Sequence, residues 1–421
     1  MRVPRLARHS AVYVAVPIAQ RVVYFLLIPV FTRYFSPSDY GAWGYASVVG
    51  TMLGTFGPLG FFSAYAYALR RPGEWRNAPA AVRRAALQGA VVLVALASVL
   101  VFPIARRVNL GVVHGDLLWL LVLAATFTGF LVQAAKRRHQ MLEEPRRFAW
   151  LELTTGLTTA AASLVAVVVL GWGVLGLAAG LLAGAAVGVI PAVRSLRIDL
   201  FGLASRESLG EAFAYGFPLF FHAGAAIMLQ YVDRFMLERM STLPELGIYS
   251  LAGQLATAMT IVATSTNQAY MPFLYRHFDL RPRLIARAQA YVAAFFATAA
   301  IGGILAAPFF IRHFIDPEFA RSSFPTQLLL AGGMFHGFYY LMLGRLLVLR
   351  RTRTAFVVTA AATALNVALN YRLIPMLAAE GAAWATLVSE FCLFAAMWYF
   401  SRGALTRSPG ADVADRIAAG S

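Results

Sequence analysis

Polar and ionisable side chains recur at helical spacing inside apolar stretches of this sequence. Arg21 lies near the middle of the first such stretch, and Gln20 and Tyr24 share its predicted helical face. A charged side chain at the centre of a bilayer costs about 2.5–3.5 kcal/mol on insertion scales, so it is expected to face the protein interior. We expect Arg21 to be a cationic anchor in a central cavity. An ion pair with a neighbouring helix is the structural alternative.

Three more polar stripes occur in the second half of the chain, within the predicted seventh, eighth and eleventh spans. Their side chains can contact sugar hydroxyl groups in a wet cavity, or can hydrogen-bond neighbouring helices, and the sequence leaves both open. A lone histidine in such a stripe is more often a packing residue than a ligand. The candidate cavity residues in these stripes are His222, Gln230, Asp233, Arg234, Gln254, Asn267, Gln268, Asn366 and Asn370.

Glu390 is the most deeply placed acidic residue, within the last apolar stretch, and is the candidate for ion coupling. Glu152 and His336 are weaker candidates for such a site. The single cysteine, Cys392, excludes an intrachain disulfide. The sequence has no P-loop lysine motif, no HExxH motif and no CxxC pair. We therefore expect no catalytic residue, no metal site and no cofactor.

The elements that must position these residues are transmembrane helices. Of the 421 residues, 60% are hydrophobic and 13% are charged, whereas a soluble domain carries roughly 25% charged residues. A span needs about 20 mostly apolar residues, which predicts an all-α integral membrane protein with about twelve spans and no soluble catalytic domain between them. The predicted spans are 11–31, 43–69, 82–105, 116–135, 148–170, 174–193, 211–232, 246–274, 285–311, 324–349, 354–371 and 379–400.

The basic residues predict the topology of these spans. The net charge is +17, and 27 of the 36 Lys and Arg residues lie in one set of alternating connections and the termini, against eight in the other set. The positive-inside rule places the richer set, with both termini, in the cytoplasm, which requires an even number of spans. The basicity is thus explained without nucleic acid, and attraction to anionic membrane lipids is a secondary consequence.

A segment pattern occurs twice in the chain. Arg33 and Arg239, Gly41 and Gly247, and Arg70 and Arg276 are each 206 residues apart. Because each half has an even number of predicted spans, both halves insert with the same orientation, as a parallel repeat. We expect an N-terminal six-helix bundle with a cytoplasmic linker (1–210), a C-terminal six-helix bundle (211–400) and a flexible cytoplasmic tail (401–421).

Several segments resemble Wzx-type polysaccharide flippases, a family related to multidrug exporters of the MATE type and to the lipid II flippase. The resemblance covers nearly the whole chain, and the order and spacing of the motifs carry it. The motifs are Thr32–Gly41, Tyr215–Pro218, Asp233–Arg234, Leu246–Ala252, Asn267–Pro272, Gly173–Gly176 and Glu380–Ala383.

The resemblance implies two six-helix bundles around a central cavity that opens alternately to each side. It implies a polyprenyl-diphosphate-linked oligosaccharide as cargo, moved from the cytoplasmic to the outer leaflet of the bacterial inner membrane for cell-surface polysaccharide biosynthesis. Membrane lipids and the glycan polymerase machinery are the implied partners. An ion-coupled multidrug exporter is the first alternative, and a membrane-embedded glycan polymerase or transferase is the second.

Overall fold

A computed structural model describes residues 3–277, 282–349 and 351–402 of the chain. These residues form helices and connecting turns, with no strand among them, so the expected all-α fold is confirmed. The chain divides into two compact units, Met1–Arg234 and Phe235–Ser421. The predicted domain boundaries at residues 210 and 400 stay predictions, and residues 403–421 of the predicted tail lie outside the described residues.

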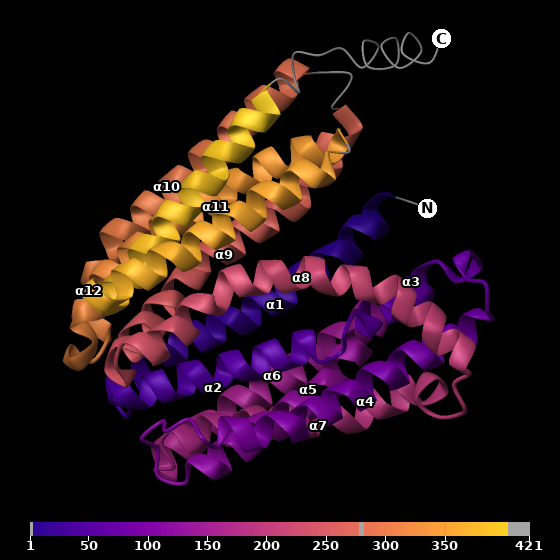
Figure 1. The fold of residues 1–421 in the computed structure, drawn as a ribbon, viewed down its shortest axis with the longest axis horizontal. Helices are drawn as coiled ribbons and strands as arrows, with labels where there is room; N and C mark the ends of the chain where they lie inside the picture. Colours follow the sequence, from indigo (N-terminus) through magenta and orange to yellow (C-terminus); the bar gives the residue numbers. More distant parts are fainter. Residues whose placement is uncertain (1–2, 278–281, 350, 403–421) are drawn as a thin grey trace. The chain divides into compact units, whose positions relative to one another are not determined.

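The N-terminal unit contains seven helices and most of an eighth (Figure 1). Helix α7 packs along α5 and α6, while α1 packs on α6. The core between α3, α4, α5 and α7 is filled by large apolar side chains such as Tyr65, Leu87, Phe130 and Leu196. The helices are α1 (Val3–Phe31), α2 (Pro37–Phe56), α3 (Phe61–Arg70), α4 (Pro79–Ala105), α5 (Gly115–Met141), α6 (Pro145–Leu164), α7 (Val174–Leu200) and α8 (Arg206–Met240).

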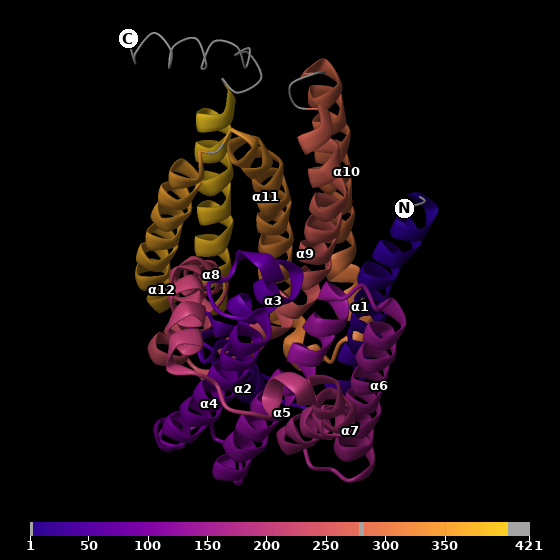
Figure 2. The same ribbon diagram turned by 90° about the vertical axis from the view of Figure 1, so that its right-hand side faces the viewer.

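The C-terminal unit is built on α11 (Ser323–Val348), which packs against α9 (Leu243–His277), α10 (Pro282–Phe314) and α12 (Thr352–Ser401) (Figure 2). Helix α12 is two helices, 352–377 and 379–401, joined at Ala378, whose φ of 48° is not helical. Glu245 supports this turn, because its carboxylate accepts a hydrogen bond from the Ala379 N–H at 3.3 Å and pairs with Arg321 at 2.6 Å.

Seven of the described helices are long and apolar enough to cross a membrane, and there are eight such segments if α2 and α3, which meet at 54°, form one bent span. Apolar side chains face outward on them, as Val99 on α4 and Leu305 on α10 do, at 70% and 73% exposure. Outward apolar surface of this kind requires lipid around it. The protein is therefore a multi-pass membrane protein, while the count of twelve spans stays a prediction.

The helix starts follow the repeat in the sequence. Helix α2 begins at Pro37 and α9 at Leu243, which are 206 residues apart. Helix α7 begins at Val174 and the second helix of α12 at residue 379, which are 205 apart. An acidic residue occupies the first turn of both α2 and α9, Asp39 and Glu245 respectively. The two halves thus share the order and the spacing of their helices.

The bend between α2 and α3 rests directly on α8. Gly60, with φ of 86°, lies at this bend, and its backbone contacts the backbone of Gly216 in α8. A methyl group on either glycine would overlap backbone atoms of the other. Two small residues are required at this point because the helix backbones approach more closely than any side chain allows.

We expect Gly216→Ala to lower the free energy of unfolding by about 1–3 kcal/mol, the usual cost of overpacking a close contact. The matched control is Gly210→Ala on the same helix, where a methyl group meets nothing within 4 Å. Because alanine favours helix by about 0.5–1 kcal/mol over glycine, the control should unfold at the same temperature as the parent or above it. Thermal unfolding in detergent measures both variants, and equal behaviour of the two would contradict the close contact.

Candidate functional site

The N-terminal unit contains a cavity of about 860 Å³, lined mainly by α2, α3 and α5. Its walls combine apolar and aromatic side chains with a smaller set of polar ones. The aromatic lining residues are Trp43, Phe56, Phe62, Phe130, Phe148 and Phe220. The polar lining residues are Ser47, Thr51, Thr55, Ser63, Thr126, Gln133, Lys136, Arg137 and Gln140.

One wall of the cavity carries a ladder of hydroxyl groups along α2. Ser47, Thr51 and Thr55 are four residues apart and so lie on one helical face. The Thr51 hydroxyl donates to the Ser47 carbonyl at 2.8 Å, and the Thr55 hydroxyl donates to the Thr51 carbonyl at 2.9 Å. Since the hydroxyl protons are committed to the backbone, these oxygens present their lone pairs to the cavity. The ladder can therefore accept hydrogen bonds from a ligand rich in hydroxyl groups.

The end of the cavity formed by the last turns of α5 is cationic. Lys136 Nζ pairs with Glu152 Oε2 at 2.8 Å, and both side chains are nearly buried, at 10% and 13% exposure. The next residue, Arg137, is exposed and donates from Nη1 to Gln140 Oε1 at 3.0 Å. No carboxylate within the described residues pairs with Arg137. The Lys136–Glu152 pair is neutral as a whole, so Arg137 supplies an uncompensated positive charge.

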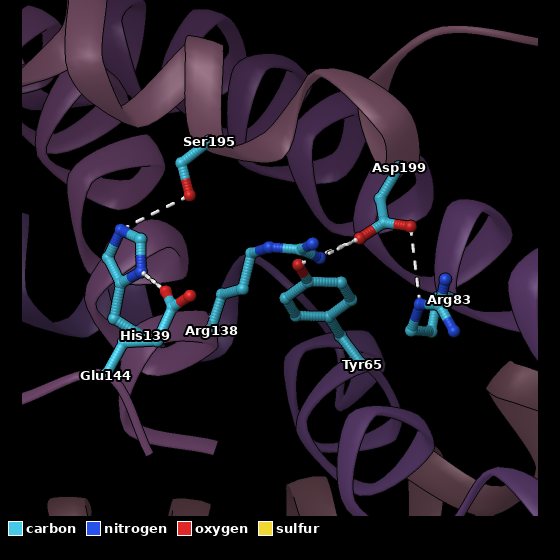
Figure 3. A network of polar contacts seen from close by, with 7 residues as sticks. All are labelled: Tyr65, Arg83, Arg138, His139, Glu144, Ser195 and Asp199. Atoms are coloured by element: carbon cyan, nitrogen blue, oxygen red, sulfur yellow. Dashed lines mark hydrogen bonds and ion pairs between the residues drawn. The ribbon is translucent and has the colours of Figure 1, made fainter. Parts of the chain in front are cut away.

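A buried carboxylate holds this end of α5 in place (Figure 3). Asp199, on α7, is 1% exposed. It accepts from Arg138 Nη1 at 2.7 Å, from Arg83 Nε at 3.3 Å and from the Tyr65 hydroxyl at 3.2 Å. One acidic residue thereby joins α3, α4, α5 and α7. Because Arg138 is directed toward Asp199, the adjacent Arg137 is fixed on the cavity side of the helix.

A second set of contacts closes the turn between α5 and α6 (Figure 3). His139 Nδ1 lies 2.6 Å from Glu144 Oε2, and His139 Nε2 lies 3.3 Å from the Ser195 hydroxyl. Arg147 donates to Glu144 Oε1 at 2.9 Å. Partial burial alone would raise the pKa of Glu144, but the bonds from His139 and Arg147 hold that pKa below its usual value. Glu144 is therefore ionised at neutral pH and anchors the turn that follows the cationic end.

The predicted residues on α1 separate into two environments. Gln20 Nε2 donates to the Tyr24 hydroxyl at 3.3 Å, and that hydroxyl donates to the Gly156 carbonyl at 3.2 Å, so both residues join α1 to α6. Arg21 is exposed near the middle of α1 and forms no hydrogen bond or ion pair with a described residue. None of the three lines the cavity. Arg21, within the predicted first span, is therefore a second cation that no described carboxylate compensates.

The predicted stripe on α8 forms a local cluster at the end of the N-terminal unit. Asp233, at 3% exposure, accepts from the backbone N–H of Arg234 at 2.8 Å and from Arg234 Nη1 at 3.0 Å. Arg234 Nη1 also donates to the carbonyl of Gln230 at 2.9 Å. The side chain of His222 lies outside the described residues.

In the C-terminal unit, Asn366 and Asn370 are buried and bonded to each other, since Asn370 Nδ2 donates to Asn366 Oδ1 at 2.9 Å. Gln254 and Gln268 are exposed on α9, and Asn267 is half-buried. Their assignment to a substrate cavity stays a prediction. The acidic candidate Glu390 lies on the second helix of α12 and contacts His336 of α11, with Glu390 Oε2 3.0 Å from Nδ1 of the histidine.

The cavity of the N-terminal unit is lined by none of the predicted site residues, although two signals for it are present in the sequence. The first is the hydroxyl ladder on α2, whose residues are four apart. The second is the polar face of α5, in which Thr126, Gln133 and Gln140 recur at multiples of seven. Lys136 and Arg137 were interpreted only as topology signals. Several basic residues lie at this end of the bundle. The rotation of each helix decides which of them line the cavity, and a count of charges along the sequence gives no information about rotation.

The chain matches a family model described as polysaccharide biosynthesis protein over residues 6–278. A search of curated protein sequences gives no match.

Several solved structures share the fold of this chain. A lipid II flippase, MurJ, in an inward closed conformation has a TM-score of 0.78 at 14% identity, with 92% of this chain and 87% of that chain covered. An inward-facing multidrug resistance MATE family transporter of the MOP superfamily has a TM-score of 0.70 at 12% identity, with coverage of 92% and 94%. A MOP superfamily transporter from Pyrococcus furiosus has a TM-score of 0.55 at 13% identity, with 93% of each chain covered. At these identities the likeness shows the fold alone.

We expect Asp199→Asn to destabilise the N-terminal unit by about 3–5 kcal/mol, because it leaves the guanidinium groups of Arg83 and Arg138 without their shared counter-ion. The control Glu143→Gln breaks an exposed pair with Arg70, whose side chains are 60% and 43% exposed. A surface pair contributes about 1 kcal/mol or less, so the control should change little. Thermal unfolding in detergent compares them, and a small effect of Asp199→Asn would argue against the anchoring role of the carboxylate.

Proposed function

The chain belongs to the polysaccharide biosynthesis protein family, and from that membership we propose that it is a flippase for lipid-linked oligosaccharides. It moves a polyprenyl-diphosphate-linked glycan from the cytoplasmic to the outer leaflet by alternating access, as a step in cell-surface polysaccharide biosynthesis. It works in the cytoplasmic (inner) membrane of a bacterium with both termini in the cytoplasm, and it hands its cargo to glycan polymerase machinery.

The observation that carries this proposal is the pairing of an uncompensated cation with a hydroxyl ladder in one cavity. Arg137 lies at one end of the cavity, and Ser47, Thr51 and Thr55 line its wall. A diphosphate linked to a sugar presents the complementary groups in the same order: an anion, then hydroxyl groups. The aromatic lining residues, such as Trp43 and Phe62, add flat apolar surface for the faces of sugar rings.

The physical demand on such a carrier is to lower the cost of moving a dianionic headgroup through hydrocarbon. A guanidinium group meets this demand because its planar donors bind phosphate in a bidentate manner and remain charged at any physiological pH. The polyprenyl chain is apolar and needs no site, since it can remain in the bilayer. No covalent bond changes, so the carrier requires positioned charges and hydrogen bonds only.

Arg21 and the polar stripes of the other helices extend this proposal. Arg21 is an exposed, uncompensated cation on α1, so we assign it a role in carrying the diphosphate together with Arg137. Gln20 and Tyr24 support α1. The residues that we predict to contact the sugars during translocation are His222, Gln230, Asp233, Arg234, Gln254, Asn267, Gln268, Asn366 and Asn370.

An exporter of small drugs is the second candidate, because the largely aromatic lining also suits an apolar molecule. A cationic drug, however, would meet Arg137 as a like charge. A deletion strain separates the two functions. Accumulation of lipid-linked sugar on the cytoplasmic side supports the flippase, whereas drug sensitivity with normal surface glycan supports the exporter.

We expect Arg137→Ala to reduce translocation by about tenfold or more, since a hydrogen bond to a charged group contributes about 1.5–3 kcal/mol. Arg137→Lys should retain part of the activity, and Arg21→Ala should show a similar loss. The measurement is the appearance of a polyprenyl-diphosphate-linked oligosaccharide in the outer leaflet of proteoliposomes, detected with an impermeant glycosidase. The control Arg146→Ala removes an exposed charge from the same end of the unit but outside the cavity. Equal losses in Arg137→Ala and Arg146→Ala would exclude a specific role for Arg137.

We expect the double variant Thr51→Val, Thr55→Val to raise the apparent KM for the lipid-linked oligosaccharide roughly fivefold, because each lost hydrogen bond contributes about 0.5–1.5 kcal/mol. Valine keeps the shape of threonine, so the cavity volume is preserved. Thr154→Val on α6 is the control, since its hydroxyl makes the same kind of bond to the Trp150 carbonyl, at 2.7 Å, away from the cavity. Competition by a lipid diphosphate without sugar should be unaffected, and a loss of that competition would show that the ladder does not contact the glycan.

A further inference from the structure

The C-terminal unit contains a titratable pair between two of its helices. His336 Nδ1 on α11 lies 3.0 Å from Glu390 Oε2 on the second helix of α12. The two side chains are 26% and 13% exposed. Neither residue forms another hydrogen bond or ion pair with a described residue. Within the described residues, this base and this acid are therefore bonded only to each other.

The pair lies at the middle of both helices. Residues 323–348 of α11 have their midpoint at 335–336, and residues 379–401 of α12 have their midpoint at 390. With a rise of about 1.5 Å per residue, each side chain is about 16–20 Å from either end of its helix. The hydrocarbon core of a bilayer is about 30 Å thick. Both groups thus lie at the depth where an unbalanced charge is most costly.

This pair differs from the other buried carboxylate contacts of the protein in the nature of its cation. Glu152 pairs with Lys136 and Asp199 with two arginines, and these cations keep their charge at physiological pH. A histidine changes its charge between about pH 5 and 8. Among the described histidines, His139 also contacts an acid, Glu144, but that acid is additionally held by Arg147 at the end of its bundle. Among the described ion pairs, only His336–Glu390 places a histidine beside a carboxylate at the middle of two helices.

The surroundings of the pair are aromatic and hydroxylic. The ring centroids of Tyr340 and Tyr339 lie 4.7 and 5.3 Å from that of His336. From α9, the Tyr249 hydroxyl lies 3.4 Å from Thr386, one turn before Glu390.

Arg345, further along α11, is directed to Gln289 of α10, since its Nε donates to Gln289 Oε1 at 2.9 Å. Within the described residues, Glu390 is the only charged side chain in a hydrogen bond or ion pair with His336.

The charge of the pair depends on a single proton. With one proton shared, as an ion pair or as two neutral groups, the pair has no net charge. Without that proton the carboxylate is left with a neutral imidazole, and the net charge is −1. A net charge buried at mid-bilayer is strongly unfavourable, whereas a neutral hydrogen-bonded pair is tolerated. The helices can therefore close around the pair when the proton is bound and must admit water when it has left.

We propose that His336 and Glu390 form a proton-binding site that couples the conformational cycle to the transmembrane proton gradient. The site takes one proton from water on one side, passes through the occluded state as a neutral pair, and releases the proton to water on the other side. Imidazole is a poor ligand for hard cations such as Na⁺, which bind oxygen atoms, so the ligand is a proton. The proposal rests on the flippase function only for the identity of the coupled cargo.

Two measurements on the full-length purified protein test this site. In proteoliposomes, a gradient of about one pH unit corresponds to a tenfold ratio of proton activity. For exchange of one proton per cargo, the gradient should shift the distribution of lipid-linked oligosaccharide between leaflets by up to about tenfold. We expect Glu390→Gln and His336→Gln to give the same distribution with and without the gradient. The control Tyr249→Phe removes a neighbouring interhelical contact and should keep the response.

The second measurement needs no cargo and so remains decisive if the flippase proposal fails. Infrared difference spectra, recorded while the pH is varied, should show a protonated-carboxyl band in the parent protein that is absent in Glu390→Gln and shifted in His336→Gln. Monodisperse gel filtration confirms that each variant is folded. An unchanged gradient response in Glu390→Gln, the absence of a band that depends on Glu390, or a response to a Na⁺ gradient in place of a proton gradient would each overturn the proposal.

Discussion

A charged group buried in the protein needs a partner, and much of this structure follows from that constraint. Asp199 is almost fully buried, and it is stable there because two guanidinium groups and a phenol donate to it. The same contacts fix the rotation of α5 and α7 relative to α3 and α4. Since the cost of an unpaired buried charge exceeds that of most packing defects, this cluster sets the geometry of the unit around it.

Among the charged residues proposed to act in transport, three lack a permanently charged partner within the described residues. Arg21 and Arg137 have no described carboxylate beside them, which is tolerable only where water or an anionic ligand supplies the compensation. Glu390 has a partner whose charge depends on pH. The N-terminal unit thus contains two cations without a described carboxylate partner, while the C-terminal unit contains a carboxylate paired with a histidine.

Close backbone contacts add a second constraint. Gly60 and Gly216 bring the α2–α3 bend against α8, and such an approach buries backbone groups that have no water to bind. The bend falls inside the predicted second span, 43–69, and the positive φ of Gly60 is the backbone conformation that turns the chain there. The partner of the break was not predictable, because Gly216 is distant in sequence and no local pattern links the two positions.

The sequence by itself determined the helical membrane fold, the repeat and the polar residues at depth, because hydropathy and helical period act locally along the chain. Arg21 and Glu390 lie on α1 and α12, and their roles stay predictions. Only the tertiary structure decided that Gln20 and Tyr24 join α1 to α6, that Glu390 meets His336, and that Lys136 and Arg137 line a cavity whereas the nearby Arg138 does not. These outcomes depend on how helices rotate and pack against one another, and that rotation is set by contacts between residues far apart in the chain.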